Sequence, residues 1–149
     1  MQLKKTLSLT YLLAVLSAFH KIQAVAVAVG ITLFISVGVT LFAIQTRFDF
    51  TAKCWMVALT LTLALFGFAI AMSITAAFSS TAFPILQAVY GGIGALLMAI
   101  FLAIDTQMLI GGKKYKYSEE DYVNAALQIY IDISYMFMYL LQIFGAGKK

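Results

Sequence analysis

The chain has one cysteine, one histidine and one proline, and charged residues make up only 11% of it. The single Cys54 excludes an internal disulfide and a thiolate metal cage. Because His20 is the only imidazole, we expect no zinc or haem site, and no cofactor is predicted. The sequence has no phosphate-binding loop, no metalloprotease motif and no Ser-His-Asp set, so we do not expect an enzyme.

Apolar residues are abundant instead: they form 63% of the 149 residues, and the mean hydropathy is +0.98. A soluble domain of this size cannot bury so much apolar surface, so the composition predicts an integral membrane protein in contact with the lipid bilayer. The net charge of +4 comes from Lys and Arg in short connections. This placement is typical of topology signals and headgroup contact, and it gives no reason to expect a nucleic-acid partner.

Charged residues, together with a Ser-rich break before Pro84, divide the chain into five apolar segments. We predict an all-α fold, a polytopic membrane helix bundle with five transmembrane helices in one transmembrane domain, 1–149. Pro84 suits the first turn of a helix, Gly111 suits a helix C-cap, and Ser118 with Asp121 has the form of a capping box. The first segment is short, since about 20 residues are expected for a span, and it becomes long enough if the lysines near its start snorkel. The predicted spans lie near 3–19, 22–46, 54–78, 84–110 and 119–144.

The last of these segments carries a polar stripe. When it is wound at about 3.6 residues per turn, its polar side chains fall on one narrow face, and the other faces hold Leu, Ile, Met, Phe and Ala. A membrane helix turns such a stripe away from lipid, toward protein or a wet cavity, so we expect the other helices to surround it. The stripe consists of Asn124, Gln128, Asp132, Tyr135, Tyr139 and Gln142.

Two carboxyl groups stand inside the predicted spans, those of Asp105 and Asp132, and no basic residue inside a span offsets them. Burying an ionised Asp at the centre of a bilayer costs about 2.5–3.5 kcal/mol on insertion scales. The two acids therefore share a proton, face water, or hold a cation such as Ca²⁺, which prefers oxygen ligands. If they meet, the pair would respond to pH near neutrality.

The depth of the two acids decides whether they meet. At a rise of about 1.5 Å per residue, Asp105 lies about 9 Å from Gly111 and Asp132 about 20 Å from Ser118, a mismatch of about two turns. The mismatch shrinks if the first turn of the last helix stands in the headgroup layer. The alternative is two separate buried acids, each hydrogen-bonded to a hydroxyl or amide. Because acids inside a membrane are candidates for function, we predict that Asp105 and Asp132, supported by the rest of the stripe, form an ion-binding site for a hard cation such as Ca²⁺.

Several segments resemble the Bax-inhibitor family, also called the transmembrane BAX inhibitor motif family. They are Phe101-Leu-Ala-Ile-Asp-Thr-Gln107, Gly111-Gly-Lys113 and Tyr117-Ser-Glu-Glu-Asp-Tyr-Val-Asn-Ala-Ala-Leu-Gln-Ile-Tyr-Ile-Asp-Ile133. Two more, Ala28-Val-Gly-Ile-Thr32 and Gln45-Thr-Arg-Phe-Asp-Phe-Thr51, are similar to the lifeguard branch of that family.

The resemblance implies a fold of seven helices, with the last helix central and surrounded by the others. The chain begins where the third helix of the family would begin, so we expect it to lack the first two. Asp105 and Asp132 match the paired aspartates of the family, which implies a pH-sensitive latch on a Ca²⁺ leak. In the family, a basic residue on one of the absent helices pairs with them. The resemblance also implies a location in the endoplasmic reticulum or Golgi, a role in calcium homeostasis and suppression of apoptosis.

Three functions stay open at this point. The first is a Ca²⁺-permeable channel of the leak type, gated by pH through Asp105 and Asp132. The second is a non-conducting membrane interaction protein that inhibits cell death by binding membrane-protein partners. The third is a proton-coupled transporter that uses the same two acids.

Overall fold

The computed structural model describes residues 2–78, 81, 83–111 and 118–145, and these residues form helices joined by short connections, with no strand among them. The all-α helix bundle predicted from the sequence is confirmed. The helices are α1 (Gln2–Ala18), α2 (Ile22–Gln45), α3 (Phe50–Lys53), α4 (Trp55–Phe78), α5 (Phe83–Ile110), the 3₁₀ turn η1 (Glu119–Asp121) and α6 (Tyr122–Gly145).

Four of the described helices, α2, α4, α5 and α6, are long and apolar enough to cross a membrane. Helices of this kind are typical of an integral, multi-pass membrane protein. Helix α1 forms where the first span was predicted, near 3–19, but its 17 residues give a length of about 25 Å, less than the hydrocarbon thickness of about 30 Å. The predicted count of five spans is therefore not confirmed: four helices of the described residues meet the length and composition of a span.

Local chemistry explains where the helices end. Pro84 is the second residue of α5, where its missing N–H costs no helical hydrogen bond. Gly111 takes a φ of 82° and donates its N–H to the Gln107 carbonyl at 3.0 Å, so the predicted glycine cap is confirmed. The predicted capping box does not form. The Ser118 hydroxyl donates to Asp121 Oδ2 at 2.7 Å and accepts no backbone N–H, because the chain enters α6 through the 3₁₀ turn η1.

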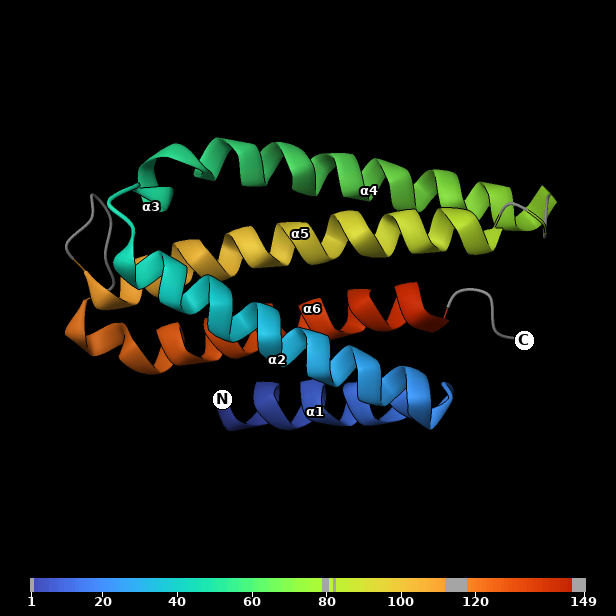
Figure 1. Cartoon of the computed structure of the whole chain (residues 1–149), viewed down its shortest axis with the longest axis horizontal. Helices are drawn as coiled ribbons and strands as arrows, with labels where there is room; N and C mark the ends of the chain where they lie inside the picture. Colours follow the sequence, from blue (N-terminus) through green and yellow to red (C-terminus); the bar gives the residue numbers. More distant parts are fainter. Residues whose placement is uncertain (1, 79–80, 82, 112–117, 146–149) are drawn as a thin grey trace.

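Helices α5 and α6 form the most extensive contact in the molecule, and the other helices pack around this pair. Helix α4 covers α5, α1 lies along α6, and α2 crosses both members of the pair (Figure 1). Large apolar side chains on the outer faces, such as Phe34 of α2 and Phe66 of α4, are exposed. In a bilayer these faces meet lipid tails.

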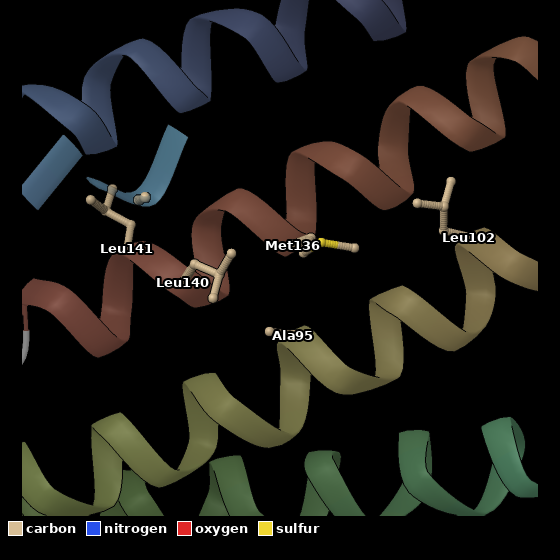
Figure 2. Packing of buried hydrophobic residues seen from close by; sticks show 6 residues of the cluster. Ala95, Leu102, Met136, Leu140 and Leu141 are labelled. Carbon is tan, nitrogen blue, oxygen red and sulfur yellow. The ribbon is translucent and has the colours of Figure 1, made fainter. Parts of the chain in front are cut away.

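The core follows from this arrangement. One cluster of buried side chains joins α2, α5 and α6: Ala28, Ala95, Leu102, Met136, Leu140 and Leu141. Figure 2 shows Met136 and Leu140 in the space between the α5 and α6 ribbons, with Ala95 facing them from α5. A second cluster joins α4 and α5: Ala58, Leu65, Leu97 and Ile104. Helix α5 thus has a buried side toward each neighbour.

Glycines of α5 allow α6 to approach closely. A Cβ atom added at Gly91 would lie 2.6 Å from the Tyr139 carbonyl oxygen, and one added at Gly94 would lie within 2.6 Å of three atoms of the Tyr139 ring. No larger residue fits these two positions without movement. Small residues on this face of α5 thus admit a neighbouring backbone, which is common where membrane helices pack.

Candidate functional site: a buried acidic pair

The structure brings Asp105 of α5 and Asp132 of α6 together. Both side chains are buried, with 6% and 2% of their surface exposed, and the two carboxyl groups lie close enough to influence each other's charge. The structure therefore favours a pair over two separate acids. The stagger of the helices explains why the mismatch in depth is no obstacle, since about 15 Å of α6 precedes Asp132 and only about 8 Å of α5 follows Asp105.

The closeness of the two carboxyl groups sets the chemistry of the pair. Ionised carboxylates only accept hydrogen bonds, so a bond between two carboxyl groups would need a proton on one of them. The four membrane-crossing helices contain no Lys, Arg or His, so their own residues provide no positive charge to neutralise two carboxylates. Two buried acids without such a charge are more stable with one proton between them than with both groups ionised.

Three helices contribute further buried oxygens. Ser36 Oγ, Thr106 Oγ1 and Asp132 Oδ2 have no hydrogen-bond partner among the residues that the structure describes. They come from α2, α5 and α6. Buried polar atoms of this kind usually find a protein group, a water or an ion. The described residues include no group of three or more His, Cys, Asp or Glu that could hold a metal, so two carboxyl groups are the acidic ligands available here.

The predicted polar stripe of α6 is divided between two environments. Asp132 is buried, Tyr139 and Gln142 are half-buried, and Asn124, Gln128 and Tyr135 are exposed. The prediction that the stripe turns toward protein or a wet cavity agrees with the burial of the first three, and it stays a prediction for the exposed three. The stripe lies along the edge of the buried face of α6, and Asp132 is its member nearest the centre of that face.

Tyr139, another member of the stripe, packs against α5. Its ring lies against Gly94 and meets the Tyr90 ring edge-on, with 5.7 Å between the ring centroids. A cleft of about 310 Å³ beside these rings is lined by α4, α5 and α6, and Tyr135 also borders it. Neither acid lines this cleft or the two described clefts of about 490 and 420 Å³, so the pair opens into none of the three.

Gln107 is a residue of this region to which the sequence reasoning gave no role. Its side chain is 2% exposed, and it bonds the backbone at the end of α2 and at the start of α3. The sequence did contain one signal for such a role: the side-chain amide of Gln107 stands two residues after Asp105 in an otherwise apolar segment. A buried amide in such a segment needs partners, although the sequence does not say which.

Taken together, four helices that can cross a membrane and a buried acidic pair between the two central ones define a class: multi-pass membrane proteins with an intramembrane carboxyl pair. Residues 3–149 match the family model described as "Inhibitor of apoptosis-promoting Bax1". The chain belongs to this family.

Named relatives agree. The chain is 38% identical to Protein lifeguard 3 of Mus musculus over 141 residues, which cover 95% of this chain and 45% of the relative. It is 36% identical to Protein lifeguard 3 of Homo sapiens over 140 residues, covering 94% and 44%. To Protein lifeguard 4 of Mus musculus it is 29% identical over 151 aligned residues, covering 97% and 56%. The chain thus spans about half the length of these relatives, and no solved structure matches it.

Proposed function

We propose that this chain is an anti-apoptotic protein of the endoplasmic reticulum or Golgi membrane that lets Ca²⁺ leak from the store, with Asp105 and Asp132 as the gate. The observation that carries the proposal is the closeness of two buried acids at the contact of the central helices. Membership of a family described as inhibitors of apoptosis-promoting Bax1 supports the cell-protective part.

The shared proton would keep the gate closed. While one acid donates to the other, the pair carries a single negative charge and draws α5 and α6 together. When the proton leaves, two carboxylates about 4 Å apart repel each other by about 4 kcal/mol at an effective dielectric constant of about 20. That energy is comparable to a helix contact, so the acids separate and take up water. Acidic conditions would therefore close the gate and alkaline conditions would open it.

The opened pair suits Ca²⁺ as a passing ion. Ca²⁺ takes about six to eight oxygen ligands, and two carboxylates with nearby hydroxyls and water supply only part of such a shell. A site of this kind would attract the ion without holding it tightly, which conduction requires. Here Ca²⁺ is the transported ion and not a resident cofactor.

The test is Ca²⁺ flux into proteoliposomes at several pH values. Wild type is expected to show flux that rises with pH, and Asp132→Asn is expected to lose this dependence, because an amide cannot release the proton. Asp121→Asn, which changes an exposed acid of η1, is the matched control and should behave as wild type. Flux of Asp132→Asn identical to wild type at every pH would reject the gate.

A second candidate is a non-conducting protein that protects cells by binding other membrane proteins. The exposed amide of Gln128 favours it, because a polar side chain on a membrane helix gains from a protein partner. The double variant Asp105→Asn with Asp132→Asn separates the candidates. Full protection of cells by this variant would support binding. Loss of protection, accompanied by loss of the pH dependence of the flux, would support the leak.

A further inference from the structure

The side-chain amide of Gln107 holds three backbone groups at once. Its Oε1 accepts the N–H of Phe50 at 2.8 Å, and its Nε2 donates to the carbonyl oxygens of Phe48 at 2.9 Å and Ala43 at 3.2 Å. Both amide N–H groups and the amide oxygen are thus in use. Because the side chain is buried, water does not compete for these bonds.

The three groups belong to the ends of two helices. Ala43 is in the last turn of α2, where carbonyl groups lack helical partners, and Phe50 is the first residue of α3, where N–H groups lack them. Phe48 lies between the two helices. One side chain of α5 therefore fastens the whole connection from Ala43 to Phe50, which we call the α2–α3 connection.

The place of Gln107 on α5 relates this connection to the acidic pair. Gln107 is two residues after Asp105, about 3 Å further along the axis, toward the end of the helix at Gly111. Residues 102–107 are all buried, and so is Thr51 of α3, which packs on α5. The α2–α3 connection and α3 thus lie against the C-terminal end of α5, the end nearer to Asp105.

We propose that Gln107 is a positioning residue that keeps the α2–α3 connection over this end of the bundle and so shields the acidic pair from water and ions on that side. Loss of the Gln107 bonds would free the connection and expose the pair, while the carboxyl groups themselves stay unchanged. The inference rests on the proposed function in taking the pair as the gate, but the shielding can be measured without ion flux.

The experiment uses the full chain in lipid nanodiscs with two readouts. Hydrogen exchange at the Phe50 amide reports the α2–α3 connection, and residue-resolved mass spectrometry after a water-soluble carbodiimide and an amine reports access to Asp105 and Asp132. Gln107→Met keeps the size of the side chain and removes all three bonds. We expect exchange at Phe50 to be about five- to tenfold faster, as for the loss of one hydrogen bond of ordinary strength, and labelling of the two acids to rise by about as much.

Two further variants make the result specific. Gln87→Met removes an amide from the opposite end of the same helix and should leave both readouts at the wild-type level. Gln107→Glu keeps an oxygen for the Phe50 N–H but cannot donate to the two carbonyls when ionised, so labelling should rise while exchange at Phe50 changes little. Gln107→Glu also provides the answer if Gln107→Met does not fold.

Unchanged labelling of Asp105 and Asp132 in a folded Gln107 variant would overturn the shielding, even if exchange at Phe50 is faster. Equal labelling in the Gln87 and Gln107 variants would overturn it as well. These outcomes are distinct from failure of the proposed function, which would appear as pH-independent flux in wild type, whatever the labelling shows.

Discussion

Replacing Gly94 by alanine tests the close contact between the two central helices. The added Cβ would lie within 2.6 Å of three atoms in the Tyr139 ring, so either the ring or the helix must move. The Tyr90 ring, which lies edge-on to the Tyr139 ring, limits movement in its direction, so the ring would have to move toward the cleft that both rings border. Overpacking of this kind costs about 1–3 kcal/mol. Alanine also gains about 1 kcal/mol over glycine in helix propensity, so the net loss of stability is smaller than the cost of the clash.

Gly92→Ala is the matched control, because a Cβ at Gly92 meets no atom within 4 Å. Both variants share the gain in propensity, so the difference between their unfolding free energies isolates the clash and should be about 1–3 kcal/mol. Gly91→Ala should be at least as damaging as Gly94→Ala. Its Cβ meets the Tyr139 carbonyl oxygen at 2.6 Å, and a backbone atom cannot rotate away as a ring can.

Unfolding by SDS in mixed micelles, followed by the fluorescence of the single Trp55, measures these differences. A double-mutant cycle assigns them to the ring: in a Tyr139→Ala background, Gly94→Ala should cost little, giving a coupling of about 1–3 kcal/mol. The reasoning would be refuted if Gly94→Ala were as stable as Gly92→Ala, or if its cost were the same with and without the Tyr139 ring.

Three further predictions concern the periphery of the bundle. Asp49 is the N-cap of α3 and accepts the N–H of Ala52 at 3.2 Å. Asp49→Ala should therefore lower the free energy of unfolding by about 1 kcal/mol and speed hydrogen exchange at Ala52, whereas Asp49→Asn should change neither. Equal exchange at Ala52 in the two variants would contradict the cap. The Thr10 hydroxyl of α1 and the Tyr130 hydroxyl of α6 are 2.5 Å apart. Thr10→Val should weaken the binding of α1 to α6 by about 1 kcal/mol, which would appear as faster hydrogen exchange throughout α1. Unchanged exchange would show that this bond does not hold α1. Burial raises the pKa of the Cys54 thiol, so less thiolate is present at neutral pH in the folded protein than in the denatured protein. Iodoacetamide should therefore react more slowly with the folded protein, and the difference in rate should narrow as the pH rises. Equal rates would contradict this.

The long helices could be predicted from the sequence because their boundaries are chemical. Predicted spans near 22–46, 54–78 and 84–110 correspond to α2, α4 and α5 within a residue or so, since charges, Pro84 and Gly111 mark the ends. The short helix α3 was missed. Four residues bury too little surface to create a periodic pattern, and α3 depends on Asp49 as its cap and on packing against α5.

The acids could be selected from the sequence, but their contact could not be derived from it. Counting residues gave a mismatch of about two turns, because the count assumed helices that start and end level with each other. The stagger of α5 and α6 is a property of their packing, fixed in part where Tyr139 enters the space at Gly91 and Gly94. Gln107 was missed for a similar reason, since its partners are backbone groups of distant residues, to which the identity of a side chain gives no guide.

The two ends of the α5–α6 contact differ in a way that bears on the proposed gate. At the Gly91 and Gly94 end the helices touch through backbone and ring, so separation there would open a tightly filled contact. Asp105 lies 11 residues beyond Gly94, about 16 Å along the axis, so an opening of about 3 Å at the pair requires a rotation of only about 10° about the glycine end. The pair is thus on the side where a small angle produces the largest separation. On that side Gln107 joins α5 to the α2–α3 connection, so a movement of α5 driven by the repulsion between two carboxylates would act against the hydrogen bonds of this one amide as well as against the packing of Leu102 and Met136.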